Sequence, residues 1–277
     1  MKVHHLNCGS MRPAGGKLLD GEPGLLRRAE LVAHCLLIET GDGLVLVDTG
    51  FGREGVARPG EWLGRPFLTL VGAKPVAAET AVAQIKALGL DPADVRHIVM
   101  THLDVDHAGG LADFPNAVVH VRAEEHRAAT APANAAEKNR YRAAQFAHSP
   151  RWSTYDEAGE PWFGFEAVRS LKGLPAEILL VPLTGHTRGH TGVAVDTGDG
   201  WLLHAGDAYF FHGQLDPVAP HCPPGLTVFQ NLVQTLRGPR LENLARLHEL
   251  ARDHPDEVKV FSAHSPVELA ALRRGTV

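Results

Sequence analysis

The segment Thr101–Gly110, with the sequence THLDVDHAGG, restricts the fold and chemistry of this chain more than any other. Within six residues it carries two imidazoles and two carboxylates, namely His102, Asp104, Asp106 and His107. Packed together, such side chains would repel and desolvate one another unless a cation lay among them. The segment also follows an apolar run, His97–Met100, that is typical of a short strand. A divalent metal site at a strand end is therefore predicted, and a solvated polar turn is the alternative.

Further candidate ligands also stand where predicted strands end. Asp48 follows LVLV, His186 and His190 follow EILLV, Asp207 follows WLLHA, and His264 follows VKVFS. Loops at one rim of a sheet bring together side chains that are far apart in sequence, which is how α/β scaffolds usually build sites. We therefore expect one shared site.

Hairpins and alternating helices and strands together favour a mixed-sheet α/β sandwich, expected as a single domain over residues 1–277. Strands are predicted at 33–39, 44–48, 97–100, 117–121, 177–181, 193–197, 201–205 and 258–262. Helices are predicted at 77–88, 123–147 with an interruption at Pro132, 227–236, 240–253 and 266–274. The aromatic segment 148–175 is predicted as a long ordered loop, either a core flap or a lid over substrate. The turn sequence TGDG occurs at 40–43 and 197–200, which suggests two related halves.

Composition argues against several classes of protein. The formal net charge is −5, from 27 Lys and Arg against 32 Asp and Glu, and the basic residues are scattered, so a nucleic-acid partner is not expected. Cys8, Cys35 and Cys222 form no CxxC pair, which argues against a disulfide framework and a thiolate zinc site. Neither a leader nor a membrane-spanning run is apparent, so a cytoplasmic protein without a membrane partner is expected. Exposed aromatic loops would suit a homodimer.

Five motifs together resemble the metallo-β-lactamase superfamily: VDTG at 47–50, THLDVDHAGG at 101–110, TGHTRGHTG at 184–192, GD at 206–207 and SAH at 262–264. The resemblance runs from about residue 33 to the C-terminus and looks closest to the quorum-quenching lactonases. It implies an α/β fold, a four-layer αββα sandwich with two mixed sheets. It also implies a dinuclear centre at one edge, with zinc as the first choice of metal and manganese or iron as alternatives.

The resemblance also implies a set of ligands. A first metal would be held by His102, Asp104 and His190, a second by Asp106, His107 and His264, and Asp207 would bridge the two. Asp48 would orient ligands without binding metal. His186 is left out of the ligand set.

Residue 104 departs from the family pattern HxHxDH, which has His where this chain has Asp. A carboxylate is shorter and anionic, so the first site is expected to favour manganese or iron more than an all-imidazole site does, and to bind metal weakly. There are two alternatives. The centre could be mononuclear, with a metal only in the second site, or Asp104 could be a loop residue that binds no metal. Asp104→His is predicted to increase zinc retention.

The resemblance implies hydrolysis, in which a metal-bound hydroxide attacks a small lactone or other carboxylic ester. Asp207 would bridge the ions and Asp106 would pass a proton to the leaving group. Tyr209 would hydrogen-bond the substrate carbonyl, or else be a buried core residue. A phosphodiesterase or organophosphate hydrolase, a diiron oxidoreductase and a non-catalytic binding protein are the alternative functions.

Overall fold

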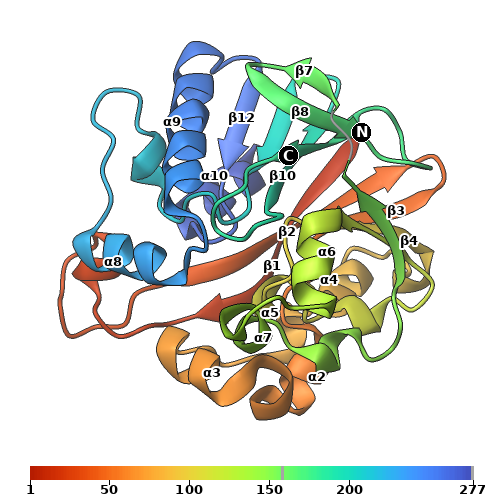
Figure 1. Ribbon diagram of the computed structural model, residues 1–277, viewed down its shortest axis with the longest axis horizontal. Coiled ribbons are helices and arrows are strands. Elements are labelled where there is room, and N and C mark those ends of the chain that lie inside the picture. The colour runs from red at the N-terminus through yellow and green to blue at the C-terminus, as the bar shows by residue number, and fades with distance from the viewer. Residues whose placement is uncertain (157–158, 276–277) are drawn as a thin grey trace.

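Two mixed six-stranded sheets form the centre of the computed structural model, which describes residues 1–156 and 159–275 (Figure 1). The first sheet contains, in spatial order, β1 (Lys2–Met11), β2 (Leu31–Thr40), β3 (Gly43–Val47), β4 (Val95–Val99), β5 (Val118–Arg122) and β6 (Arg151–Tyr155). The second contains β12 (Val258–Phe261), β11 (Trp201–His204), β10 (Thr191–Asp196), β9 (Ile178–Pro182), β8 (Phe165–Ser170) and β7 (Glu160–Trp162). Strands β3 to β6 are parallel to one another, as are β11 and β12, and the other neighbours are antiparallel.

The sheets pack against each other through one face and against helices through the other. In β2, Leu36 and Ile38 belong to the core between the sheets, whereas Cys35 and Leu37 belong to the core on the outer side. Successive strand residues point to opposite faces, so a strand buried on both faces needs a continuous apolar run. This is why the apolar residues of β2 do not alternate with polar ones.

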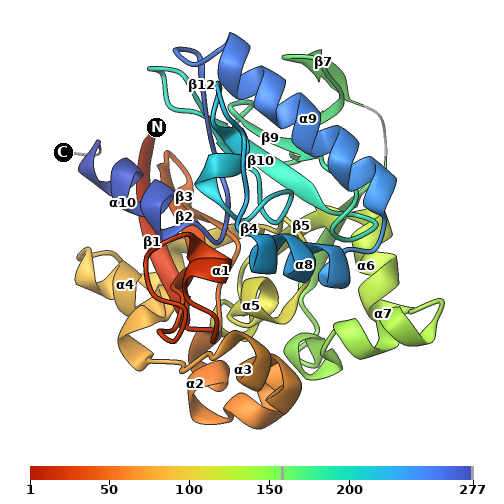
Figure 2. The ribbon, with the colours of Figure 1, turned by 90° about the vertical axis from the view of Figure 1, so that its left-hand side faces the viewer.

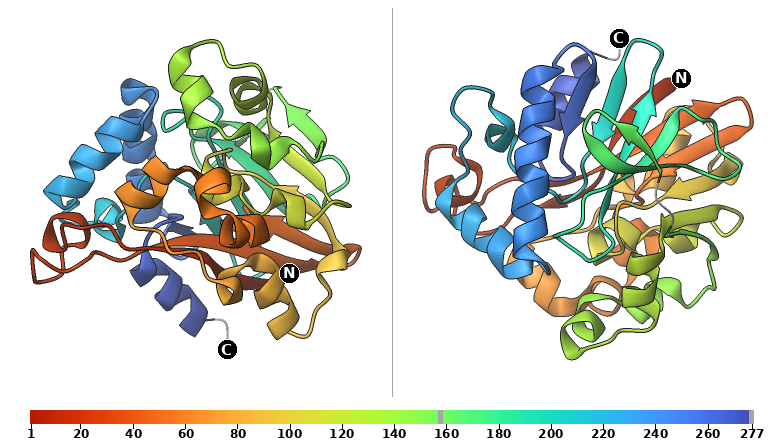
Figure 3. Two further views of the ribbon diagram at one scale, coloured as in Figure 1. Left: turned by 90° about the horizontal axis from the view of Figure 1, so that it is seen from below. Right: turned by 45° about the horizontal axis from the view of Figure 1, so that its top comes forward.

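Helices cover the outer faces of the two sheets, and some short helices lie in the segments that surround the site. The α-helices are α1 (Lys17–Asp20), α2 (Gly52–Ala57), α3 (Arg65–Val71), α4 (Ala81–Ala87), α5 (Val105–Ala108), α6 (Ala123–Thr130), α7 (Ala135–Arg140), α8 (Pro224–Val233), α9 (Arg237–Asp253) and α10 (Pro266–Arg274). Val82 and Ile85 of α4 pack on the first sheet, and Leu247 and Leu250 of α9 pack on the second. Helix α9 lies along the second sheet in Figures 2 and 3. Over the described residues, no helix is long and apolar enough to cross a membrane.

The αββα arrangement of two mixed sheets is confirmed, as are the strands predicted to precede the candidate ligands. Both TGDG sequences are hairpin turns, between β2 and β3 and between β10 and β11. In each turn a threonine hydroxyl donates to a glycine carbonyl 2.8 Å away, Thr40 to Gly43 and Thr197 to Gly200. The two sheets thus contain one equivalent hairpin each.

The segment 148–175 differs from its prediction, because it forms strands β6, β7 and β8 and not a long loop. Its aromatic side chains Tyr155, Trp162 and Phe165 are buried in the cores. Residues 157 and 158 of this segment lie outside the described residues. The interruption predicted at Pro132 within the helical segment 123–147 is confirmed, because α6 and α7 are separated around this proline, which lacks the N–H that a helix interior requires. Helix α7 ends at Arg140, earlier than predicted.

Candidate metal centre

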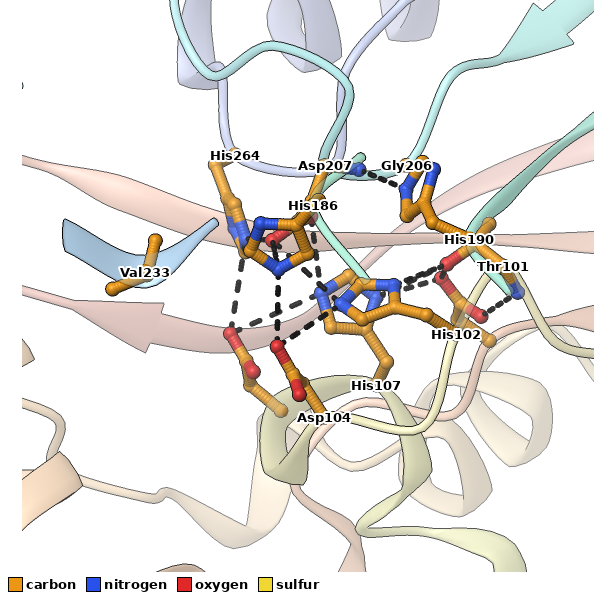
Figure 4. Close-up of polar contacts among 12 residues, drawn as sticks. Thr101, His102, Asp104, His107, His186, His190, Gly206, Asp207, Val233 and His264 are labelled. Carbon is orange, nitrogen blue, oxygen red and sulfur yellow. Dashed lines mark hydrogen bonds and ion pairs between the residues drawn. The ribbon is translucent and has the colours of Figure 1, made fainter. Parts of the chain in front are cut away.

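The candidate ligands meet at one rim of the two sheets (Figure 4). Asp48 follows β3, the segment 102–107 follows β4, His186 follows β9, Asp207 follows β11, and His264 follows β12. Asp106 and His107 lie in the short helix α5, which follows the loop after β4. The structure therefore confirms that loops at strand ends bring these residues together.

The side chains form two groups, each suited to one cation. The first ligand group consists of His102, His186 and Asp207, and the second ligand group consists of Asp106, His107 and His264. Within each group the candidate ligand atoms lie within 4.8 Å of one another, and all of these residues are buried. Imidazole nitrogens and carboxylate oxygens are the usual ligands of zinc and related divalent ions.

Asp207 lies between the two groups. Its Oδ2 atom is 3.2 Å from Nε2 of His186 and 3.0 Å from Nε2 of His264. Its Oδ1 atom is 3.2 Å from Nε2 of His107. One carboxylate is therefore within reach of both groups, as a bridging ligand must be.

Hydrogen bonds on the far side of three imidazoles leave their Nε2 atoms facing the centre. Nδ1 of His107 lies 2.8 Å from Asp48 Oδ2, Nδ1 of His264 lies 2.7 Å from the Val32 carbonyl oxygen, and Nδ1 of His102 lies 3.0 Å from Thr101 Oγ1. A proton held on Nδ1 leaves the Nε2 lone pair available for a metal.

Asp48 is placed as predicted, in contact with ligands but outside both groups. Its carboxylate accepts hydrogen bonds from the backbone N–H of Thr101 at 2.8 Å and from the Thr101 hydroxyl at 2.7 Å. Burial alone would raise the pKa of Asp48, but the charge of His107 and its hydrogen bond outweigh that effect and lower the pKa to about 2. An ionised carboxylate therefore holds His107 in place.

The centre fits a cation because it contains buried polar atoms that lack other partners. Over the described residues, Nε2 of His102, Nε2 of His107 and Oδ1 of Asp207 are buried without a hydrogen bond. Such orphaned groups are costly in a protein interior. Two divalent ions, one in each ligand group, would satisfy all three atoms.

His190 and His186 exchange the roles that the sequence suggested. Nδ1 of His190 donates to the Leu183 carbonyl oxygen at 3.0 Å, and its Nε2 accepts from the backbone N–H of Asp207 at 2.8 Å. Both ring nitrogens of His190 are thus occupied by backbone groups, and His190 belongs to neither ligand group. His186, which was left out, takes the place in the first ligand group. Burial and the nearby Arg140 lower the pKa of His186 to about 4, so its imidazole is neutral at neutral pH.

Asp104 lies at the edge of the centre and is paired with an arginine that the sequence did not indicate. Its Oδ1 accepts from Nε of Arg140 at 2.6 Å, and its Oδ2 accepts from Nη2 at 2.5 Å. Oδ2 also lies 3.4 Å from Nε2 of His102. Burial would raise the pKa of Asp104, but Arg140 holds it well below its usual range. Oδ2 is also 3.0 Å from Nε2 of His186. Asp104 is thus an ionised carboxylate beside the first ligand group, and its role as a metal ligand stays a prediction.

Tyr209 does not reach the centre, contrary to the expectation from the lactonase resemblance. Its side chain is buried and its hydroxyl donates to Oε1 of Glu268 at 2.8 Å. The next residue, Phe210, faces the centre instead, with its ring centroid 4.7 Å from that of His264. The alternative interpretation of Tyr209, a buried core residue, matches the structure.

Glu125 connects two of the three loops that carry the first ligand group, those of His102 and His186. Its buried carboxylate accepts from the backbone N–H of Leu103 at 2.9 Å and from that of Gly189 at 3.2 Å. The backbones approach so closely that a Cβ on Gly189 would lie 2.2 Å from the nitrogen of Glu125. Neither residue carried a sequence signal for this role.

The centre forms the base of a cavity of 680 Å³. Leu63, Phe67, Phe210, Phe229 and Leu232 supply an apolar wall, and Arg140, Arg142 and Arg188 supply cationic groups. Asp104, Asp106, His186, Asp207 and His264 are also exposed to this cavity. A small molecule bound there could place a polar group at the ligands and an apolar part against the wall.

The chain is similar to several known proteins. The chain is 43% identical over 276 residues to the probable metallo-hydrolase Rv2300c of Mycobacterium tuberculosis, covering 100% of this chain and 84% of that protein. It is 29% identical over 192 residues to an N-acyl homoserine lactonase of a Bacillus species, covering 67% of this chain and 68% of that one. The fold is similar to a solved N-acyl homoserine lactone hydrolase with N-hexanoyl-L-homoserine at its catalytic metal centre, with a TM-score of 0.67, 21% identity and coverage of 98% and 95%.

The fold and the clustered ligands define a metal-dependent hydrolase of the α/β sandwich class. The chain belongs to the metallo-beta-lactamase superfamily, which matches residues 28–258. Within the superfamily, its relatives and structural neighbours include the N-acyl homoserine lactonases.

Proposed function

We propose that this protein hydrolyses a small lactone or other carboxylic ester and uses two divalent ions, with zinc as the first choice. The observation that carries the proposal is the position of Asp207 at the base of a cavity, where its carboxylate oxygens lie within 3.2 Å of imidazole nitrogens of both ligand groups. Because Asp104 pairs with Arg140, the first ligand group contains two imidazoles and one carboxylate, a set that zinc accepts readily. The preference for manganese or iron was expected from a carboxylate ligand at residue 104, and the pairing of Asp104 with Arg140 weakens that expectation.

Divalent ions in such a site supply a Lewis acid for the ester carbonyl and lower the pKa of a water molecule toward neutrality. Residues of the chain would position the ions and transfer protons. Asp207 would hold the two groups at a fixed separation. Asp106, which lines the cavity 3.8 Å from Nε2 of His264, would carry a proton to the leaving alkoxide.

The substrate class follows from the cavity and from the relatives. The apolar wall, which includes Phe67 and Phe229, suits an ester or lactone with a hydrocarbon substituent. The solved hydrolase with N-hexanoyl-L-homoserine at its metal centre, which has the same fold, is the precedent for such a ligand.

The test is turnover of a panel of lactones, carboxylic esters, phosphodiesters and phosphotriesters, together with metal analysis of the purified protein. We expect about two ions per chain and turnover of lactones or esters that is lost in Asp207→Asn, which keeps the shape of the side chain. The exposed Asp199 provides a matched control, and Asp199→Asn should retain full activity.

Other outcomes would replace this proposal by a different function. Turnover confined to phosphodiesters or phosphotriesters would identify a phosphoester hydrolase on the same centre. Iron with visible redox bands would identify an oxidoreductase. Retained ester turnover in Asp207→Asn would show that the reaction does not depend on the shared carboxylate.

A further inference from the structure

The guanidinium of Arg140 reaches the metal-binding atom of a ligand in the first group. Its Nη2 atom lies 2.7 Å from Nε2 of His186, in addition to its two contacts with Asp104. A guanidinium carries only donors, so with Nε2 unprotonated, as metal binding requires, this contact uses the lone pair of that nitrogen. The same nitrogen also lies 3.0 Å from Oδ2 of Asp104 and 3.2 Å from Oδ2 of Asp207. That lone pair is the one that a metal in the first ligand group would need.

Arg140 is held in this position by further contacts. It is the last residue of α7, and its Nη1 donates to the carbonyl oxygen of Val233 at 2.6 Å. Val233 is the last residue of α8, where helix carbonyls lack partners within the helix. Arginine remains protonated at all physiological pH values, so the cation is permanent. The contacts thus hold a fixed positive charge beside the first ligand group.

The charges of Asp104 and Arg140 cancel. The family pattern has a neutral imidazole at position 104, and here an anion and a cation with two hydrogen bonds between them stand in its place. Both carboxylate oxygens face the guanidinium, so Asp104 contributes less negative charge to the centre than an unpaired carboxylate would.

We propose that Asp104 and Arg140 act as one neutral unit in which Arg140 opposes metal binding to the first ligand group. A zinc ion sits about 2 Å from an imidazole nitrogen, so the ion and Nη2 cannot share Nε2 of His186. The first ligand group therefore binds a divalent ion more weakly than the second, and the second fills first. This inference rests on the proposed two-metal centre and adds an order of loading to it.

Titration of the metal-free protein with Zn²⁺, followed by calorimetry and chelator competition, tests the inference without an activity assay. The wild type should show two affinities. Arg140→Gln should raise the weaker affinity by about tenfold or more, because it removes a cation from a low-dielectric site. Asp104→Asn should lower it by about tenfold, because it leaves the cation unpaired. The affinity of the second group serves as an internal check that each variant is folded.

The matched control is Arg142→Gln. Arg142 lines the same cavity but donates to the backbone carbonyl of Glu61, so both affinities should stay unchanged. Equal zinc affinities in Arg140→Gln, Arg142→Gln and the wild type would overturn the inference. A weaker first affinity in Arg140→Gln would also overturn it, because it would show that Arg140 assists binding.

A double substitution separates this inference from the simpler expectation that Asp104→His increases zinc retention. In Asp104→His alone, the new imidazole stands beside an unpaired guanidinium, so the first affinity should not rise. In Asp104→His with Arg140→Gln, it should rise above the wild-type value. A full gain in Asp104→His alone would contradict the neutral unit.

These outcomes are distinguishable from a failure of the proposed function. Two zinc affinities that respond as described, without ester or lactone turnover, would reject the proposed reaction only. Turnover with zinc affinities that do not respond to Arg140→Gln would reject the neutral unit only.

Discussion

The backbone N–H of Asp207 donates a hydrogen bond to Nε2 of His190 over 2.8 Å. The contact requires a close approach, since a Cβ on Gly206 would lie 2.6 Å from the same ring nitrogen. His190 therefore fixes the loop that presents Asp207 to the two ligand groups. His190 thus positions Asp207 through its backbone, whereas His186 supplies a candidate ligand atom to the first group.

His186 and His190 should respond differently to substitution. His186→Ala should reduce the bound zinc by about one ion per chain, because it removes a ligand atom of the first group. His190→Gln should retain both ions, because a glutamine amide can donate to Leu183 and accept from Asp207 as the imidazole does. Elemental analysis after desalting measures both. Loss of zinc in His190→Gln together with full retention in His186→Ala would reverse the assignment.

Asp48→Asn should weaken zinc binding to the second ligand group by about 10-fold to 100-fold. A neutral amide accepts the Nδ1–H hydrogen bond of His107 more weakly than a carboxylate does, and its N–H group would face the ring nitrogen Nδ1 that now meets a carboxylate. Asp48 has a φ of 56°, a left-handed conformation that asparagine tolerates, so the backbone should not be disturbed. Competition with a zinc chelator gives the affinity. An unchanged value would show that Asp48 does not act through His107.

Tyr209→Phe should leave kcat/KM within about twofold of the wild type and reduce stability by about 1 kcal/mol, the usual effect of one lost hydrogen bond. The hydroxyl meets Glu268 and not the cavity. Phe210→Ala provides the contrast, because Phe210 lines the cavity and its loss should raise KM. A large loss of kcat in Tyr209→Phe with unchanged stability would restore the phenol to the reaction.

Residues at strand ends could be predicted because local patterns reveal both the strand and the ligand type. The apolar run before Asp48 and the short run before His102 define β3 and β4, and parallel strands end at the same rim. The choice between His186 and His190 could not be made in this way. It depends on the carbonyl of Leu183 and the N–H of Asp207, which reach His190 only in the folded chain.

Arg140 shows the same limit more strongly. It is 36 residues from Asp104 and stands at the end of a helix, where a basic residue is favourable for helix stability alone. The strands β6 to β8 were missed for a different reason. Their aromatic residues are interspersed with Gly and Pro in a pattern typical of a loop, and they form strands because they pair with neighbouring strands and pack in the cores.

His120 should make the stability of the metal-free protein depend on pH. Burial, and to a smaller extent the nearby His97, lower its pKa from 6.5 to about 4. As the pH falls from 6.5 to 4, the unfolded chain takes up a proton that the folded chain does not, so the free energy of unfolding decreases, by about 3 kcal/mol at most. Urea denaturation at pH 7 and pH 4.5 measures the difference. In His120→Asn the difference in unfolding free energy between the two pH values should be smaller. Part of the difference should remain, because the pKa of His5 is also lowered to about 4. An equal pH difference in the variant and the wild type would show that His120 does not carry this effect.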